Sequence, residues 1–281
     1  MGLSRVAPVQ IQAYQSKEKE EKNDLLAVEE PMEIQLVHGE RANRIKQSLT
    51  ITMRTPGHDL ELTLGFLLSE GIITDRAQVR EIRHCIQVEH PEAEGNVVRV
   101  ELSESVELVE ERLQRNFVAS ASCGVCGKAS LEGIETIGCP VLPAGPVWNA
   151  SLIHSLSDKL SDFQTIFSHT GGLHAAALVD LNGKLLHVRE DIGRHNALDK
   201  LIGAAVEEEA LPLSECLIFL SGRIGFELVQ KALMAGSPVL AAVGAPSSLA
   251  VRLAKQYGMS LLGFVRNQRF NVYSGSERIR A

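Results

Sequence analysis

Long apolar segments and secretory features are missing from this 281-residue chain. No uninterrupted apolar run approaches the roughly 20 residues that cross a bilayer, and Arg5, Pro8 and Gln10 interrupt the opening stretch. The five cysteines are an odd number, and no apolar signal region opens the chain, so the thiols are expected to stay free in a reducing compartment. We therefore expect a cytoplasmic protein with no membrane role.

Two common nucleotide-binding fingerprints and an excess of positive charge are missing as well. Neither G-x-x-x-x-G-K-[ST] nor G-x-G-x-x-G occurs, which disfavours an ordinary NTPase or dinucleotide dehydrogenase. The net charge of −7 argues against a general nucleic-acid binder, although a local basic patch could hold a phosphate. Because 44% of the residues are hydrophobic, the chain can build two modest domains or one large one.

The first half of the chain predicts a small α+β domain behind a tail. Residues 1–28 are expected to form a solvated, mobile tail, since their mixed-charge run lacks apolar periodicity. Alternating apolar residues after Pro31 predict half-buried antiparallel strands, and Asp59 is expected to cap a helix that stops near Gly71. Strands at 82–88 and 97–102, with Cys85 as a small buried hydrophobe, and a charged helix at 105–115 complete the N-terminal domain, residues 29–143.

Three prolines between residues 140 and 146 predict a stiff linker, and the second domain is expected to span residues 144–281. A helix at 151–160 precedes two strands, 174–179 and 185–188, which flank an Asn-Gly hairpin turn. Short apolar runs then alternate with helices in a β-α-β-α-β series: 216–220, 226–235, 239–243, 249–257 and 261–265. This pattern predicts a three-layer α/β domain with a mainly parallel sheet.

Ligands of such sheets usually bind at the carboxyl ends of the strands, where three loops follow the apolar runs. These loops are Ser221-Gly222-Arg223, residues 244–248, and Arg266-Asn267-Gln268-Arg269. Two of them lead into helix N-termini, which attract anions, and two carry arginines that can fork onto phosphate. We therefore predict a phosphate site there. In the alternative interpretation, the glycines only turn the chain and the serines only cap helices.

The pair Cys123-x-x-Cys126 lies between two glycines and near Lys128, and it is compatible with a redox dithiol, half of a zinc site, or a nucleophile. A second ligand pair is missing, although Cys139 with His169 or His174 could in principle complete a zinc set. No H-x-E element supports a zinc deaminase, and the thioredoxin setting is missing. A nucleophilic or sulfur-carrying cysteine in an exposed loop is the favoured interpretation.

Taken together, these motifs resemble those of the FdhD family of formate dehydrogenase accessory proteins, which are sulfur carriers. The resemblance covers most of the chain beyond the tail. It rests on five stretches, namely Ser122–Ser130, His169–His174, Glu190–Ala197, Ser221–Arg223, and Gly263–Arg266 through Arg269–Tyr273.

The resemblance implies a sulfurtransferase that accepts persulfide sulfur from a cysteine desulfurase and passes it to the molybdenum cofactor, bis-molybdopterin guanine dinucleotide, before insertion into formate dehydrogenase. Cys123 would bear the persulfide and Cys126 would assist. The resemblance further implies a homodimer, a second domain similar in fold to cytidine deaminases, and no metal bound by the protein itself. The residues expected against the cofactor are Phe264, Val265, Arg266, Asn267, Gln268 and Arg269, in addition to Ser221, Gly222 and Arg223.

His195 or His174 is a candidate for proton handling, because a histidine titrates near neutral pH. Each can equally be a hydrogen-bonding structural histidine. The competing function is a non-catalytic chaperone that holds the guanine-nucleotide cofactor, with its C-x-x-C pair structural or zinc-binding.

Overall fold

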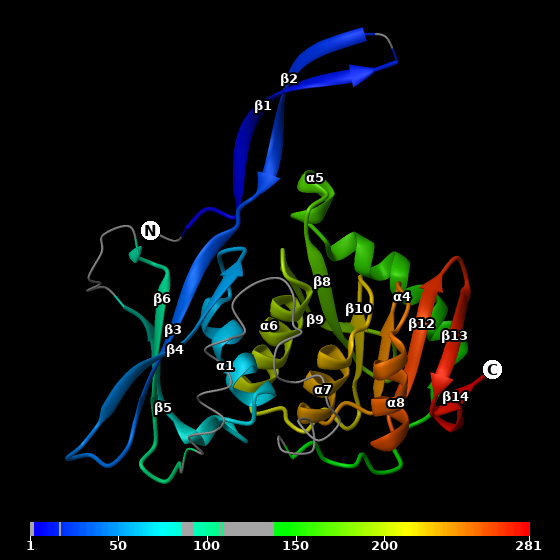
Figure 1. Ribbon diagram of the computed structural model, residues 1–281. Helices are drawn as coiled ribbons and strands as arrows, with labels where there is room; N and C mark the ends of the chain where they lie inside the picture. Colours follow the sequence, from blue (N-terminus) through cyan, green and yellow to red (C-terminus); the bar gives the residue numbers. More distant parts are fainter. Residues whose placement is uncertain (1–2, 17, 86–92, 107, 109–137) are drawn as a thin grey trace.

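The computed structural model describes residues 3–16, 18–85, 93–106, 108 and 138–281. It has the architecture of a mixed α/β protein with several sheets (Figure 1). The C-x-x-C pair and most of the charged helix predicted at 105–115 lie outside the described residues. Within those residues, no helix is both long and apolar enough to span a membrane.

The N-terminal half builds a four-stranded sheet in the order β4-β3-β6-β5, with helix α1 against one face. Alternating apolar side chains of β3 and β6, among them Ile34 and Val100, are buried there with the leucines of α1. The elements are β3 (Glu30–His38), β4 (Ile45–Arg54), α1 (Asp59–Ser69), the 3₁₀ turn η1 (Arg76–Gln78), β5 (Val79–His84) and β6 (Val97–Leu102). The predicted helix and the strands after Pro31 and at 97–102 are thus confirmed, and Cys85 is buried as expected. The strand predicted at 82–88 is observed from Val79 to His84, so Cys85 follows it, and residues 86–88 lie outside the described residues.

One detail of the predicted helix start is wrong. The cap residue of α1 is His58, in the left-handed conformation, and it makes no side-chain capping bond. Asp59 is the first helical residue and forms a two-bonded ion pair with Arg54, with both N–O distances 3.0 Å. Its carboxylate neutralises a buried guanidinium instead of capping, because Arg54 has no exposed surface.

The C-terminal half forms a six-stranded sheet in the order β13-β12-β11-β10-β8-β9. Its strands are β8 (His174–Val179), β9 (Leu185–Asp191), β10 (Leu217–Leu220), β11 (Val239–Ala242), β12 (Ser260–Arg266) and β13 (Arg269–Ser274). The hairpin β8–β9 and the series β10-α7-β11-α8-β12 are confirmed. The prediction of a mainly parallel sheet is wrong, because only β10–β11 and β11–β12 pair in parallel, while hairpins add antiparallel strands at both edges.

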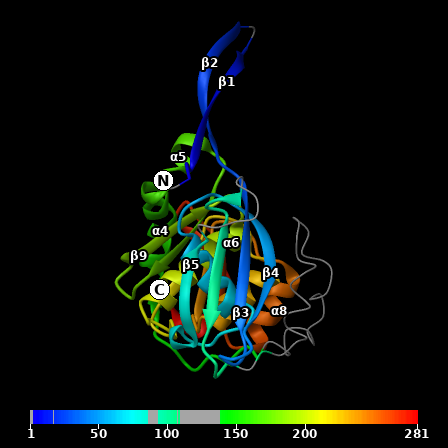
Figure 2. The ribbon, with the colours of Figure 1, turned by 90° about the vertical axis from the view of Figure 1, so that its left-hand side faces the viewer.

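Helices cover both faces of this sheet (Figures 1 and 2). Side chains of one face, such as Ile218 and Leu240, pack with α6 (Arg194–Glu207), α7 (Phe226–Met234) and α8 (Ser248–Gln256). The opposite face, including Phe219 and Ala241, packs with α4 (Ala150–Phe163) and Trp148. The smaller elements are β7 (Trp148–Asn149), α5 (Phe167–Thr170), the 3₁₀ turn η3 (Ser276–Arg278) and β14 (Ile279–Arg280). The three expected layers are therefore present.

The two halves share one hydrophobic core. A single cluster of buried side chains runs from Met32 in the N-terminal sheet to Leu261 in β12. Helices α1 and α6 cross closely at two glycines, where a Cβ on Gly65 would lie 1.8 Å from the carbonyl oxygen of Asp199. The boundary at residues 143/144 stays a prediction.

The proline segment is fastened to the C-terminal half. The Leu142 amide donates to the carbonyl of Tyr257, and Arg278 Nη2 donates to the carbonyl of Pro143 at 2.8 Å. The segment therefore has hydrogen-bonded partners along the C-terminal half.

The expected tail contains regular structure. Strands β1 (Val6–Gln15) and β2 (Glu18–Ala27) form an antiparallel hairpin that projects from the body of the molecule (Figures 1 and 2). Backbone pairing needs no apolar periodicity, so this mixed-charge stretch forms paired strands, and the expected mobility of residues 1–28 stays a prediction. Most of its side chains are exposed, as the charged sequence predicts.

Candidate functional site

The loops after β10, β11 and β12 lie side by side at the carboxyl ends of the strands. The Gly244 amide donates to the carbonyl of Gly222 at 3.1 Å, and the Phe264 amide donates to the carbonyl of Gly244 at 3.1 Å. A Cβ on Gly244 would lie 2.7 Å from the carbonyl oxygen of Gly222, so only glycine permits this approach. We call the loops 221–225, 244–248 and 263–269 the loop edge.

The third loop is shorter than the sequence predicts. Asn267 and Gln268 form the two-residue turn of the β12–β13 hairpin, with φ of 52° and 56°. Such a turn matches the twist of two antiparallel strands. Arg266, Asn267, Gln268 and Arg269 are exposed, and Phe264 is partly buried with φ of 57°.

Two of the residues expected against the cofactor have structural positions instead. Val265 is fully buried in the core on the α4 side of the sheet. Ser221 Oγ accepts a hydrogen bond from the Ala175 amide at 2.8 Å and so joins β10 to β8. Arg223 is exposed, whereas Gly222 packs beside the ring of His174.

Cationic groups gather beside the loop edge, at the start of β8 and α6. His174 is half-buried, and its pKa is lowered by burial and then by the charges of Arg194, His195 and Arg223. The neutral imidazole is therefore favoured at neutral pH while the two arginines stay charged. Sequence reasoning did not select Arg194. Its position as the first residue of a helix beside the loop edge was the available signal.

His195 is paired with an acid. Its Nε2 lies 2.9 Å from Oε2 of Glu227, at the start of α7. The contact links the N-terminal turns of α6 and α7.

A buried carboxylate fixes the N-terminus of α6. Asp191 Oδ2 accepts from the Thr55 amide at 3.1 Å and pairs with Lys200 Nζ at 2.7 Å, while Oδ1 accepts from the Gly193 amide at 2.8 Å. Burial lowers the pKa of Lys200, and the charge of Asp191 opposes that shift. Because Thr55 follows β4, this one carboxylate connects both halves directly behind Arg194 and His195.

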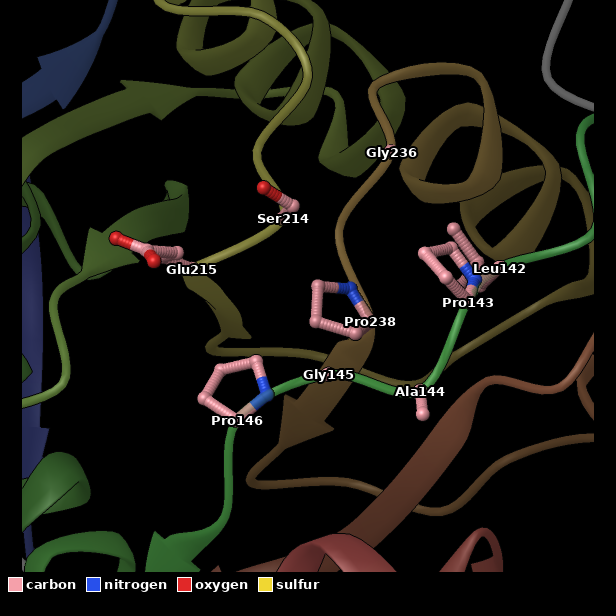
Figure 3. Close-up of a pocket in the computed structure, with 9 residues that line it drawn as sticks. All are labelled: Leu142, Pro143, Ala144, Gly145, Pro146, Ser214, Glu215, Gly236 and Pro238. Carbon is pink, nitrogen blue, oxygen red and sulfur yellow. The ribbon is translucent and has the colours of Figure 1, made fainter.

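Two cavities lined by described residues lie away from the loop edge. One, of about 330 Å³, is lined by the proline segment, by Ser214 and Glu215 before β10, and by Pro238 before β11 (Figure 3). It is at the amino ends of the strands, opposite the end where ligands of α/β sheets bind. The second cavity lies at the N-terminal sheet.

The described residues contain no cluster of three or more His, Cys, Asp or Glu side chains that could hold a metal ion. Of the expected helpers of a zinc site, Cys139 is buried and His169 contacts the Thr165 carbonyl through Nδ1 at 2.7 Å. Cys123 and Cys126 lie outside the described residues.

Comparison with known proteins decides the family. The model of the FdhD/NarQ family matches residues 27–280, which is nearly the whole chain. The chain belongs to the FdhD/NarQ family. Among FdhD/NarQ relatives, the sulfur carrier protein FdhD of Streptomyces coelicolor is 46% identical over 259 residues, covering 91% of this chain and 89% of that protein. The sulfur carrier protein FdhD of Sulfolobus acidocaldarius is 41% identical over 275 residues, covering 98% and 99%.

The FdhD/NarQ fold is also found in a solved structure. The crystal structure of a putative formate dehydrogenase accessory protein from Desulfotalea psychrophila superposes with a TM-score of 0.75, at 23% identity, and covers 99% of this chain and all of that one. The expected likeness to cytidine deaminases stays a prediction.

Proposed function

We propose that this protein is a cytoplasmic sulfur carrier. It takes persulfide sulfur from a cysteine desulfurase onto Cys123 and delivers it to bis-molybdopterin guanine dinucleotide before that substrate enters formate dehydrogenase. The observation that carries the proposal is membership of the FdhD/NarQ family across residues 27–280, with relatives that are named sulfur carriers. A homodimer is part of the same proposal.

The sulfur transfer needs two thiols and one external reductant. The Cys123 thiolate attacks the outer sulfur of the desulfurase persulfide, which forms Cys123–S–SH and releases the desulfurase thiolate. The Cys126 thiolate then attacks Cys123 Sγ, so the outer sulfur leaves as hydrosulfide toward the molybdenum. The resulting Cys123–Cys126 disulfide is returned to two thiols by a cellular dithiol, which is itself oxidised to a disulfide.

The loop edge supplies what a pyrophosphate-bearing substrate requires. Arg223 and Arg194 are cations beside half-buried His174, and Arg266 and Arg269 are exposed at the β12–β13 turn. Helices α7 and α8 begin directly after the first two loops, so their N-termini add partial positive charge. In this proposal the arginines bind phosphates and the neutral His174 donates or accepts one hydrogen bond.

Mass spectrometry tests the carrier role. The protein is incubated with a cysteine desulfurase and cysteine, and the proposal requires one added sulfur of 32 Da on the peptide that contains Cys123, an addition lost in Cys123→Ser. Cys216→Ser is the matched control, since burial raises the pKa of the Cys216 thiol and disfavours its thiolate. If no sulfur is added and Cys123→Ser still supports formate dehydrogenase activity in cells, the protein is a cofactor-holding chaperone instead.

Nucleotide binding tests the loop edge separately. Guanosine diphosphate, a fragment of the proposed substrate, is titrated calorimetrically against the wild type and Arg223→Gln. Loss of a charge-assisted phosphate contact is expected to weaken binding about tenfold. Arg252→Gln, an exposed arginine on α8 outside the loop edge, is the matched control and should bind as the wild type does. Equal affinity of wild type and Arg223→Gln would remove Arg223 from the site.

A further inference from the structure

An arginine-lined cavity lies at the N-terminal sheet, apart from the loop edge. Its volume is about 410 Å³, and we call it the arginine pocket. Arg41 and Arg44 come from the turn between β3 and β4, and Arg80 comes from β5. The remaining lining residues are Ala77, Ser103 and Glu104. Two separate chain segments thus bring three guanidinium groups to one cavity in a protein whose net charge is −7.

Several other arginines of the described chain have acidic partners that these arginines lack. Arg54, Arg76 and Arg83 each pair with a carboxylate, at N–O distances of 3.0, 2.8 and 2.7 Å. In the described part of the chain, Arg41 and Arg80 have no hydrogen bond or ion pair and are exposed. Two cations therefore line the cavity without an ion pair to a carboxylate of the described residues.

Arg44 is held in place by main-chain oxygens. Its Nη1 donates to the Leu102 carbonyl at 2.8 Å and to the Gly39 carbonyl at 3.3 Å. Its Nη2 is buried and has no hydrogen-bond partner among the described residues. This buried Nη2 is itself closed to solvent. Arg44 therefore acts on the cavity as a fixed positive charge held by two carbonyls, which favours an oxyanion there.

The net charge of the lining defines the ligand. Three arginines and Glu104 leave a net charge of +2 (3 − 1), which a dianion would neutralise. The neighbouring His38 adds no charge at neutral pH, because its pKa is lowered by burial and by Arg44. A phosphate group fills only part of about 410 Å³, and pockets of roughly 300–1,000 Å³ hold small organic ligands.

We propose that the arginine pocket binds a small organic dianion, with its phosphate or paired carboxylates on Arg44 and on the flanking Arg41 and Arg80. The pocket is separate from the loop edge. Strand β3 runs from Glu30, beside the Arg54–Asp59 pair, to His38 at the pocket end, which is about 26 Å at roughly 3.3 Å per residue. The ligand of the arginine pocket therefore does not contact the site proposed for the cofactor.

Calorimetric titration of the full-length protein tests the proposal, with phenyl phosphate as the phosphate probe and succinate as the dicarboxylate probe. We expect saturable binding of at least one probe at one site per chain. The double variant Arg41→Gln/Arg80→Gln should bind that probe at least about tenfold more weakly, because two charge-assisted contacts are lost. Arg83→Gln, on the same strand as Arg80 but paired with Glu81, is the matched control and should bind normally.

The outcomes separate this pocket from the loop edge. Both arginine residues changed in the double variant are exposed, so its melting temperature should match that of the control, and a weaker affinity then reports the pocket itself. The probe that binds identifies the anion as phosphate or dicarboxylate. Binding of neither probe, equal binding by the double variant, or loss of binding in Arg223→Gln instead would overturn the proposal.

Discussion

The crossing of α1 and α6 predicts a large effect for a very small change, Gly65→Ala. The added Cβ would lie 1.8 Å from the carbonyl oxygen of Asp199 and 2.9 Å from the amide nitrogen of Gly203. Both atoms belong to the backbone of a helix and cannot rotate away. A carbon normally stays about 3.5 Å from such atoms, so the helices would have to separate by roughly 1.5 Å. That movement would loosen packing along the whole α1–α6 contact.

Overpacking a close contact of this kind typically costs 1–3 kcal/mol and sometimes more, and backbone on both sides places Gly65→Ala at about 3 kcal/mol or above. At roughly 2–4 °C per kcal/mol for a chain of this size, the melting temperature should fall by about 6–12 °C. Circular dichroism at 222 nm measures it. Because the two halves share a core, we expect one transition, displaced as a whole.

The matched control is Gly225→Ala, since no atom lies within 4 Å of its added Cβ and its φ is −85°. It should shift the melting temperature by no more than about 3 °C, as surface changes do. An equal shift for both variants would refute the steric reasoning. A Gly65→Ala profile with two steps, only the first displaced, would refute the shared core and support independent domains.

Two further predictions concern charges behind the site. Asp191→Asn should cost about 3–5 kcal/mol in urea unfolding, because it leaves the buried ammonium of Lys200 unpaired. Lys200→Met should cost less, because the buried Asp191 carboxylate that it leaves still accepts hydrogen bonds from the Thr55 and Gly193 amides. Equal costs would contradict the assignment. Burial alone would raise the pKa of Glu61, but hydrogen bonds from His58 and Arg189 outweigh it and lower the pKa to about 2. The stabilisation from Glu61 is therefore complete above about pH 4.5 and lost as the pH falls toward 2. Glu61→Gln should flatten the pH dependence of the unfolding midpoint in that window. An unchanged pH profile would refute the pairing of Glu61 with His58 and Arg189.

Much of the C-terminal sheet was predictable because its signals are local. The runs 216–220, 239–243 and 261–265 are fully apolar and separated by helical segments, which only a sheet covered on both faces accommodates. The edge strands were harder to assign. Residues 269–274 are exposed or half-buried. Their pairing with β12 depends on a turn in which Asn267 and Gln268 both have positive φ. Asparagine is enriched in this conformation, whereas a glutamine in the sequence gives no such signal.

The site was predictable at the level of loops and less so at the level of side chains. Strand order and helix starts are sufficient to bring 221–223 and 244–248 to one edge. Which side chains face outward depends on register shifts, and the bulge between Gly263 and Arg266 buries Val265 while it exposes its neighbours. The role of Asp191 depends on Thr55, which is 136 residues away, and no sequence pattern signals such a contact.

The main-chain bonds that join Gly222, Gly244 and Phe264 separate two tasks that many binding sites combine. Anchoring of the loops rests on peptide groups and on the lack of a side chain at Gly244 and Gly263, whereas contact with a ligand is left to projecting residues such as Arg223 and Arg269. Substitutions at the projecting positions therefore leave the frame intact. Such an arrangement is readily adapted by evolution, since ligand preference can drift along the exposed positions while the geometry of the scaffold stays constant.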